Sequence, residues 1–559
     1  MAETSLNPIR LLKNLNRGRE IITVLLVYGF GDLLDRMGIL SYLKWGKRIV
    51  SFRKHEIVAN LTTAQRIRLA LEELGPTFVK FGQVLSTRAD LIPADLIEEL
   101  THLQDRVPSF DSDVSVAQVE SELGKTIDVA FAEFTREPLA AGSLAQVHRA
   151  RHFDGRDLAV KVRRPRIVFE IERDLGVLLE LAQLLDRQVP ESRVFDPIGL
   201  VNHFARTIRR ELNFRREART TQEFARLFKD DPRVRVPDVV ESLSTDAVLT
   251  MEYIDGFKGN DQAAIVAAGL DPKVVARNGA QIFMRQAFEM GIFHGDPHPG
   301  NLRVQPDGKL VMLDYGMVGY LEETKREQLV DVFLAISRHD VDRAVSLVME
   351  VGNPSQTIDR TLLRADVQDF IETYYGLPLD QLRVDRMLND FVAILGNYGL
   401  RCPADLMLLI RAIVTLEGVG RSLDPHFNLA GELAPFVETM VRKRYDPRRI
   451  AQRTLDDLKV LFGAAHDLPL HLGATLKKVS QGELSVSLEH RGLDRLINEF
   501  DRSSNRIVVG LVTSALVVSA ALIIRSAALG TMWFGVPLFI LSGVLGLWLV
   551  WGILRSGRL

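Results

Sequence analysis

The chain has 559 residues, of which 25% are charged and 47% hydrophobic, and its formal net charge is −2 at pH 7. This length and balance predict two or more folded domains and exclude wholesale disorder. The small net charge gives no general attraction to nucleic acid, so we expect no nucleic-acid partner. The single cysteine, Cys402, excludes an internal disulfide and a multi-cysteine metal site, and it is typical of a reducing compartment.

Residues 1–125 are predicted to form an N-terminal helical extension. The first seven residues lack the basic-then-apolar layout of a secretory signal. Residues 21–34 are apolar but are interrupted by glycine and aspartate and are too short to cross a bilayer, so we expect a packed or interfacial helix. Residues 35–75 also read as helical, and Pro93 is expected to start a further helix through Leu103.

A Lys-x-Gly-Gln element lies within this extension, with Lys80 and Gln83 three residues apart. Pro76 suits the first turn of a helix. On that helix Lys80 and Gln83 would share one face. Such a pair is usually a solvated face, so its spacing alone does not assign a function.

Residues 126–256 change to a strand-like pattern and are predicted to form a small β-rich lobe. A strand is expected at 129–134, and an Ala/Gly/Ser turn over residues 138–143 would lead into the next strand. The small side chains of such a turn let backbone N–H groups approach phosphate oxygens. The third strand, at 158–162, carries Lys161 at the position of the kinase lysine that binds the α- and β-phosphates.

A lysine of this kind needs a glutamate on a helix to hold it. The charged helix expected at 210–218 offers Glu211 and Glu217, although such a charge run is often only a solvated face. Strands are then expected at 234–240 and 247–251. The following segment, which begins at Glu252, resembles the hinge between kinase lobes, where the backbone would bind adenine.

The predicted helical lobe comprises residues 257–430, and a helix is expected at 274–290. After that helix, residues 294–301 read His-Gly-Asp-Pro-His-Pro-Gly-Asn and provide the first candidate catalytic residues of this lobe. Asn301 follows Asp296 by five residues, and Asp314 of an Asp-Tyr-Gly element follows Asn301 by thirteen. An acid, an amide and a second acid at these spacings are typical of the kinase catalytic loop and metal-binding aspartate. The pattern therefore predicts a site for ATP and its metal ion.

The C-terminal part is predicted to comprise a helical juxtamembrane region, 431–505, and two transmembrane helices within 506–555. Two uncharged runs, at 507–524 and 533–554, are long enough to cross a bilayer, although a pair of buried helices is the alternative. Arginines flank the pair on both outer sides, which favours a cytoplasmic main domain. A basic cluster at 442–449 is either a solvated helix end or a contact for anionic lipid.

Together these motifs resemble the UbiB family of atypical protein-kinase-like proteins, from about residue 60 to the C-terminus. The resemblance implies an α+β, protein-kinase-like two-lobe fold with an N-terminal helical extension over the active site and a C-terminal transmembrane hairpin. It also implies a role in isoprenoid-quinone (ubiquinone) biosynthesis and behaviour as an ATPase more than as a protein kinase.

The resemblance assigns a role to each motif residue. The loop over the ATP phosphates corresponds to Ala140, Ala141, Gly142 and Ser143, with Gly142 where many relatives have alanine, which frees the backbone. Lys161 corresponds to the phosphate-binding lysine and Glu217 to its helical partner. Asn301 and Asp314 correspond to the metal ligands and Asp296 to the catalytic acid.

Three further residues correspond to regulatory positions. Lys80 and Gln83 belong to the element that occupies the place of a peptide substrate. Glu211 corresponds to the first acid of a Glu-x-Asp motif that would meet Lys80. The second acid is replaced by Asn213, so we expect a weaker inhibitory contact.

The sequence therefore predicts a membrane-associated ATPase or phosphotransferase that uses ATP and Mg²⁺. The expected partners are membrane lipid, isoprenoid-quinone precursors and quinone-biosynthetic enzymes, with a homodimer left open. The expected location is the bacterial inner membrane, with the main domain in the cytoplasm. Two alternatives stay open: a non-catalytic nucleotide-binding scaffold for lipid-biosynthetic enzymes, and a true protein kinase.

Overall fold

The computed structural model describes most of the chain up to residue 444. The described residues are 15–39, 61–86, 88, 92–103, 109–352, 358–378, 381–400, 402–444, 507–508, 510–519, 521–522, 537 and 540–546. They fall into two compact units, Met1–Ala451 and Gln452–Leu559.

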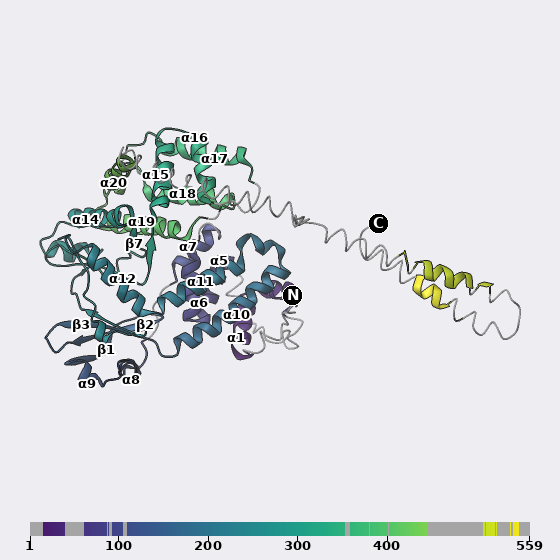
Figure 1. Ribbon diagram of the computed structural model, residues 1–559, viewed down its shortest axis with the longest axis horizontal. Helices are drawn as coiled ribbons and strands as arrows, with labels where there is room; N and C mark the ends of the chain where they lie inside the picture. Colours follow the sequence, from purple (N-terminus) through teal and green to yellow (C-terminus); the bar gives the residue numbers. More distant parts are fainter. Residues whose placement is uncertain are drawn as a thin grey trace, which may run out of the picture. The chain divides into compact units, whose positions relative to one another are not determined.

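The first unit begins with a bundle of short helices (Figure 1). These are α1 (Leu15–Val27), α2 (Gly31–Arg36), α5 (Thr63–Leu74), α6 (Pro76–Ser86) and α7 (Ala94–Thr101). In α1, Ile21 and Val24 are buried, so the apolar run near the N-terminus forms a packed helix. Thr62 and Gln65 form a capping box that fixes the start of α5 by satisfying backbone N–H groups. Much of the predicted helical stretch at 35–75 lies outside the described residues.

Gly82 lets α6 approach its neighbours closely. A Cβ at this position would lie 2.3 Å from Leu103 and 2.9 Å from Leu71, far inside van der Waals contact. Leu71 belongs to α5, and Leu103 follows α7. The glycine of the Lys-x-Gly-Gln element is therefore a packing residue of the helical extension.

The small lobe is built on a four-stranded antiparallel sheet in the order β1-β2-β3-β5. The strands are β1 (Glu133–Ala141), β2 (Ala145–Arg151), β3 (Asp157–Arg163) and β5 (Val248–Glu252). Helices α8 (Ser112–Leu123) and α9 (Ile127–Ala130) precede the sheet in the chain and pack against β1. Buried and partly exposed residues alternate along β3, as expected for a strand with one face in the core.

Two predictions for this lobe need correction. The strand expected at 129–134 begins only at Glu133, because residues 127–130 form the short helix α9. The turn expected at 138–143 is also shorter, since β1 continues through Ala141. The turn closes when the N–H of Gly142 donates to the carbonyl of Ala145 at 2.8 Å.

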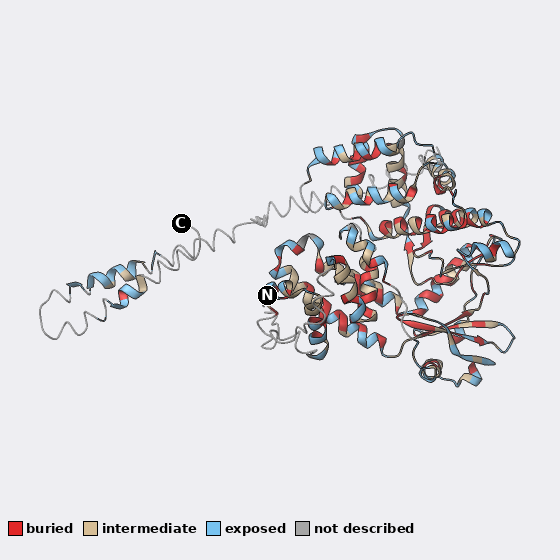
Figure 2. Ribbon diagram, turned by 180° about the vertical axis from the view of Figure 1, so that it is seen from behind, coloured by how far each residue is buried: buried red, intermediate tan, exposed pale blue. Residues whose placement is uncertain are grey.

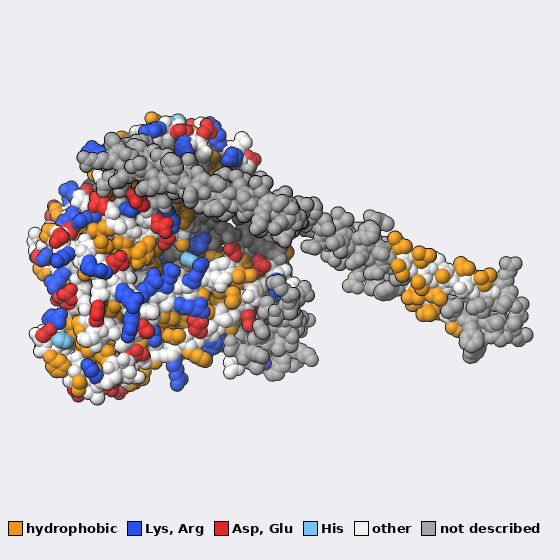
Figure 3. Space-filling model, viewed as in Figure 1, with side chains coloured by type: hydrophobic (Ala, Val, Ile, Leu, Met, Phe, Trp, Pro, Cys, Tyr) orange, Lys and Arg blue, Asp and Glu red, His pale blue; other side chains and the backbone are white. Residues whose placement is uncertain are grey.

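Two long helices and one charged helix come after the sheet strand β3. They are α10 (Ile167–Gln188) and α11 (Pro197–Glu211), separated by the 3₁₀ segment Pro190–Phe195, and then α12 (Phe214–Leu227). Asn213 caps α12 by accepting a hydrogen bond from the N–H of Arg216 at 3.1 Å. Asparagine is among the preferred residues at this position, which explains its presence in local terms. Arg206, Arg210, Arg216 and Arg219 are exposed on α11 and α12. Lys and Arg side chains gather near the middle of the molecular face that Figure 3 shows.

The larger lobe carries short strands beneath a helical body. One sheet has the order β4-β9-β8-β6, and β7 (Ile292–His294) pairs with β10 (Val318–Tyr320). The other strands are β4 (Val234–Arg235), β6 (Phe257–Lys258), β8 (Leu302–Val304) and β9 (Leu310–Met312). The strand predicted at 234–240 is much shorter than expected, because Pro237 lacks the N–H needed to continue the ladder.

Among the described residues, the helical body buries the largest hydrophobic cluster. Figure 2 colours all buried residues red. Its helices are α13 (Gln262–Ala267), α14 (Pro272–Met284), α15 (Glu323–Ser337), α16 (Val341–Gly352), α17 (Arg360–Tyr374), α18 (Val384–Asn397), α19 (Ala404–Leu423) and α20 (Leu429–Arg444). The helix predicted at 274–290 is present but changes to a π-helix over Arg285–Met290. The α+β part of the predicted fold is thus confirmed.

The described residues of the second unit form two helical stretches, 510–519 and 540–546. A Cβ on Gly546 would lie 3.7 Å from the Thr513 methyl group, so the two stretches pack against each other. Leu511, Val518 and Ile540 are more than half exposed, and Figure 3 shows the apolar surface that such side chains create. Within the described part of the chain, no helix has the length and apolarity needed to cross a membrane. Most of the predicted hairpin lies outside the described residues, as do residues 445–449 of the predicted basic cluster.

Candidate active site

A cavity of about 810 Å³ lies between the small-lobe sheet and the segments that carry Asp296 and Asp314. Its lining includes the turn after β1, the hinge segment that follows β5, and both motif loops of the larger lobe. Lys80 and Glu211 close one part of the wall. The cavity therefore brings together residues from the extension and from both lobes.

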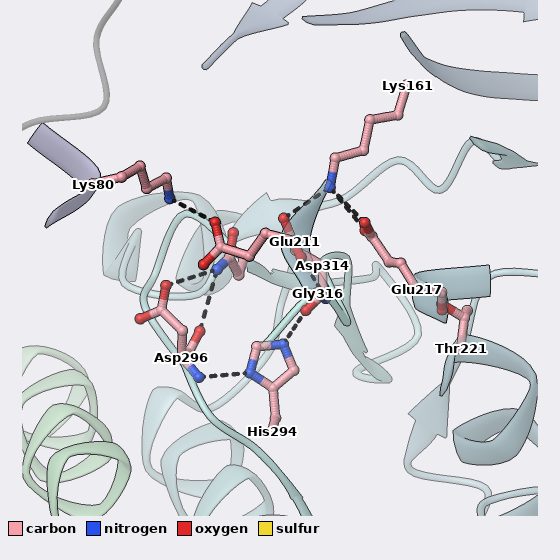
Figure 4. Close-up of polar contacts among 10 residues, drawn as sticks. Lys80, Lys161, Glu211, Glu217, Thr221, His294, Asp296, Asp314 and Gly316 are labelled. Atoms are coloured by element: carbon pink, nitrogen blue, oxygen red, sulfur yellow. Dashed lines mark hydrogen bonds and ion pairs between the residues drawn. The ribbon is translucent and has the colours of Figure 1, made fainter. Parts of the chain in front are cut away.

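Lys161 is held between two carboxylates inside this cavity (Figure 4). Its Nζ lies 2.8 and 2.9 Å from the two carboxylate oxygens of Glu217 and 3.2 Å from Asp314. Glu217 stands in the first turn of α12, and its side chain is 4% exposed. Asp314 is 44% exposed and faces the cavity. The lysine thus has a fixed anchor on one side and an accessible acid on the other.

Electrostatic interactions among Lys161, Glu217 and Asp314 stabilise this arrangement. Burial opposes the charge of Lys161, but the neighbouring carboxylates of Asp314 and Glu217 outweigh it and raise the lysine pKa. Burial raises the pKa of Glu217 to about 7 against the attraction of Lys161. Although its recessed position opposes the charge of Asp314, Lys161 and the N–H of Gly316 lower the pKa of this carboxyl to about 2. A positive lysine and an ionised Asp314 are therefore the resting state.

His294 ties the two acid-bearing segments together. Its Nδ1 accepts a hydrogen bond from the backbone N–H of Asp296 at 3.1 Å, and its Nε2 contacts the backbone carbonyl of Asp314. Because Nδ1 accepts, the ring must be neutral with the proton on Nε2, which donates to the carbonyl. Burial also lowers the pKa of His294 and so favours the neutral ring. This histidine is a structural clamp that touches both motifs.

Asp296 and Asn301 face the cavity from the same loop. The Asn301 side-chain nitrogen donates to the Asp296 carbonyl at 3.2 Å and to its carboxylate at 3.4 Å. This orientation leaves the amide oxygen of Asn301 as the atom that can face a cation. Among the described residues no three His, Cys, Asp or Glu side chains converge to hold a metal. An oxygen pair from Asn301 and Asp314 fits Mg²⁺, which usually takes one or two protein carboxylates together with phosphate and water.

The phosphate-loop residues lie at the end of β1 and the start of the turn. Ala140 and Ala141 are the last residues of β1, while Gly142 and Ser143 form the turn, and all four line the cavity. Arg164 donates to the carbonyl of Gly142 at 3.3 Å and braces the turn. Gly142 does not have a positive φ, and a Cβ there would meet only the Ala145 carbonyl at 3.6 Å. The backbone would therefore accommodate alanine.

Glu252 lies at the start of the hinge segment, as the last residue of β5. Its backbone N–H donates to the Asp238 carbonyl at 2.8 Å, and its side chain pairs with Arg235. The next residue, Tyr253, donates its N–H to the Asp157 carbonyl at 2.9 Å. Neither N–H group is available to a nucleotide base. A backbone N–H that donates to adenine must therefore lie further along the hinge, from Ile254 onward.

The residues assigned to regulation separate into two groups. Lys80 reaches across from α6 to Glu211 at the end of α11, with 3.5 Å between Nζ and the carboxylate. The Asn213 side chain is instead engaged in capping α12. Gln83 does not line the cavity, and its amide donates to the carbonyl of Leu103 at 3.1 Å. Gln83 therefore anchors the segment after α7, and of the pair only Lys80 faces the site.

Several cavity residues were not identified from sequence. Met251, Ile254 and Leu313 supply apolar wall next to the hinge and the metal-side strand. Met251 and Leu313 belong to short apolar runs of the kind that core residues share, and Ile254 lies in the predicted hinge, where the sequence assigned no role to its side chain. His298 also lines the cavity, and its Nδ1 accepts the N–H of Gly300 at 3.1 Å. His298 lies within the predicted catalytic loop, but its spacing from the other motif residues does not assign it a role.

Comparison with known families matches three parts of the chain. Residues 102–348 match the ABC1 atypical kinase-like domain, and residues 367–428 match the UbiB helical domain. Residues 491–555 match the ABC1/UbiB kinase-like C-terminal domain. The first match contains all the predicted site residues except Lys80 and Gln83.

Similar proteins extend over nearly the whole chain. A "Probable protein kinase UbiB" of Xanthomonas oryzae is 34% identical over 523 residues, which cover 92% of this chain and 94% of the relative. The protein of the same name from Xylella fastidiosa is 33% identical, with coverage of 96% and 98%. A solved structure, the Rv3197–erythromycin complex from Mycobacterium tuberculosis, shows 24% identity and a TM-score of 0.45 over 63% of this chain and 90% of that chain.

Proposed function

This chain belongs to the UbiB family of ABC1 atypical kinase-like proteins, and from that premise we propose that it is a membrane-associated, ATP-dependent enzyme that supports isoprenoid-quinone biosynthesis. The observation that carries the proposal is the Lys161–Glu217 ion pair beside Asp314, inside a cavity that Asp296 and Asn301 also line. The presence of all five polar groups in one cavity argues against a site that has lost its catalytic function.

ATP would lie with its base against the apolar wall near the hinge and its phosphates under the turn that follows β1. Lys161 would offset phosphate charge, and Glu217 would keep its ammonium in place. The short side chains of Ala140, Ala141 and Gly142 allow the loop backbone to approach the phosphates. These residues bind and orient the nucleotide without taking part in bond making.

Asn301 and Asp314 would hold Mg²⁺ through oxygen atoms, and the ion would supply charge neutralisation along the phosphates. Asp296 would orient or deprotonate the group that receives the γ-phosphate. That acceptor is water or a small lipid-like alcohol, because Lys80 and Glu211 already occupy the wall on that side of the cavity. The same closure argues against a protein substrate, which needs an open groove.

Membrane association is proposed from the C-terminal part of the chain. Its two uncharged runs are long enough to span a bilayer, and the described stretches at 510–519 and 540–546 pack together while exposing apolar side chains. Small residues at such a contact, here Thr513 and Gly546, favour close pairing of helices in lipid. We place the protein at the bacterial inner membrane with its kinase-like unit in the cytoplasm, near quinone precursors and quinone-biosynthetic enzymes.

The test of this function is quinone profiling in a bacterial strain that lacks its own UbiB protein. The strain would be complemented with the wild type, with Asp314→Asn, or with a chain truncated after Arg444. We expect the wild type to restore quinone and the other two to fail at matched protein levels. Full restoration by Asp314→Asn would instead support a scaffold that needs no metal-dependent chemistry.

A further inference from the structure

The helix that leads into the catalytic loop changes its hydrogen-bonding pattern at its end. Residues Pro272–Met284 are α-helical, and residues Arg285–Met290 form a π-helix that stops at Gly291. A π turn takes in one extra residue, which rotates the next part of the chain by about 100° relative to a continuous α-helix. Such insertions are rare in proteins, and those that occur are often found at functional sites.

The altered turn sends neighbouring side chains to different places. Arg285 is partly exposed and pairs with the buried carboxylate of Asp231 at 2.9 Å. Gln286 points inward, and none of its surface is exposed. A fully buried amide is costly unless its polar atoms are bonded, so its partners indicate its purpose.

Both partners of Gln286 belong to strands that deliver acids to the site. Its carbonyl oxygen accepts the backbone N–H of His294 at 3.0 Å, at the end of β7. Its amide nitrogen donates to the sulfur of Met312 at 3.5 Å, at the end of β9. Asp296 follows the first strand by two residues, and Asp314 follows the second by two. Gln286 thus touches both segments just before they enter the cavity.

His294 extends this connection into the site itself. Its ring bonds the N–H of Asp296 on one side and the carbonyl of Asp314 on the other. Because Gln286 fixes the backbone from which that ring projects, it also sets where the ring stands. The chain of contacts runs from the π-helix through His294 to both acids.

We propose that Gln286 is a positioning residue, which the π-helix presents so that the catalytic acid Asp296 and the metal-side acid Asp314 keep their mutual placement. The inference deepens the proposed function and rests on it for its kinetic consequences. Gln286 touches neither nucleotide nor metal and acts through His294.

The test compares three full-length variants in detergent or lipid with the wild type. Gln286→Met keeps the side-chain volume but removes the acceptor for His294. Gln286→Glu keeps an oxygen that can accept the same N–H. The matched control is Gln281→Met, the same change in the preceding α14, where the amide bonds Arg233 at 3.0 Å and Glu432 at 2.9 Å, away from the cavity.

Three quantities are measured for each protein. The first is Mg²⁺-dependent ATP turnover, and the second is nucleotide affinity in the absence of metal. The third, which needs no activity, is amide hydrogen exchange in the peptide that spans residues 292–301. We expect Gln286→Met to lose about 10- to 100-fold in turnover, as changes behind catalytic or metal groups usually do. We also expect faster exchange in that peptide, unchanged metal-free nucleotide affinity, and partial rescue by glutamate.

The outcomes separate this inference from the proposed function. Unchanged exchange, or an equal loss of turnover in Gln281→Met, overturns the positioning role. If Gln286→Met speeds exchange at 292–301 while the wild type itself turns over no ATP, the positioning of the loop stands and the enzymatic proposal fails. A loss confined to Gln286→Met, with rescue by glutamate, supports both.

Discussion

At the residue scale, the site depends on groups whose protonation is fixed by their partners. Lys161 and Asp314 are ionised because each lies beside an opposite charge, and His294 is neutral because its Nδ1 accepts a hydrogen bond. The same logic applies to His148 on β2, away from the cavity. There the ring is completely buried, donates from Nδ1 to the Thr135 carbonyl at 3.0 Å and accepts at Nε2 from Gln146.

The buried, neutral ring of His148 predicts that the small lobe is less stable in acid. Burial lowers its pKa, so between the unfolded value of about 6.5 and the lower folded value only the unfolded chain takes up a proton. The free energy of unfolding should therefore fall as the pH drops below about 6.5. Denaturant unfolding at a series of pH values should show a shallower fall for His148→Gln than for the wild type. Equal slopes would contradict the neutral, buried ring.

Tyr315, between Asp314 and Gly316, carries a buried hydroxyl for which the described residues provide no hydrogen-bond partner. Burial without a partner costs about 1–3 kcal/mol for such a group. Tyr315→Phe removes only the hydroxyl, so its free energy of unfolding should equal or exceed that of the wild type. A destabilisation above about 1 kcal/mol would show that the hydroxyl is bonded in solution.

Gly142 gives a prediction about the phosphate loop. Alanine fits its backbone and meets only an ordinary contact, so Gly142→Ala should fold normally and gain about 0.4–1 kcal/mol from the stiffer unfolded chain. On the proposed function this loop would lie against the phosphates of a bound nucleotide, so ATP and ADP affinities should change while stability does not fall. A clear loss of stability would contradict the described turn.

At the scale of elements, the helix α6 packs within the helical extension and links the extension to the cavity. The helix α6 approaches α5 and α7 at Gly82, presents Lys80 to the cavity and uses Gln83 to hold the Leu103 carbonyl. One short helix therefore combines a packing role, an anchoring role and a contact with the site. The Lys-x-Gly-Gln spacing reflects these separate demands on its successive faces.

The packing role of Gly82 can be tested against a second helical glycine. A Cβ at Gly82 overlaps two leucines, whereas a Cβ at Gly176 in α10 meets nothing within 4 Å. Gly82→Ala should destabilise the protein by about 1–3 kcal/mol through overpacking. Gly176→Ala should stabilise it by about 0.5–1 kcal/mol, because alanine suits a helix interior better. Similar effects of the two changes on thermal unfolding would contradict the close approach of α6.

At the scale of the whole molecule, motif spacing predicted which residues line the cavity better than residue periodicity predicted where helices and strands begin and end. Asp296, Asn301 and Asp314 could be identified because catalytic loops keep fixed spacings, and Lys161 because a strand presents it at a set position. The pairing of Glu217 with Lys161 and of Glu211 with Lys80 could not be chosen from spacing, since one charged run holds both acids. Gln286 could not be identified because a π turn has no simple periodic pattern in the sequence. Gln83 was predicted as a regulatory residue, but its anchoring contact could not be predicted because the partner is a distant backbone carbonyl.

The C-terminal unit predicts how the protein partitions in a cell. A chain truncated after Arg444 lacks both uncharged runs and should remain in the soluble fraction after ultracentrifugation. The full-length chain should sediment with membranes and resist extraction by salt, because apolar burial is not screened by ions. Salt extraction of the full-length protein would argue for a peripheral contact instead.

The central claim is that the cavity binds ATP together with Mg²⁺ through Asp314 and Asn301, and it is tested most directly by nucleotide affinity with and without the ion. Titration of the purified full-length protein should show tighter ATP binding when Mg²⁺ is present. In Asp314→Asn this gain should largely disappear, and turnover should fall at least about 100-fold, since phosphoryl transfer relies on such electrostatic groups. Equal affinity with and without Mg²⁺ in the wild type, or an unchanged gain and turnover in Asp314→Asn, would contradict the account.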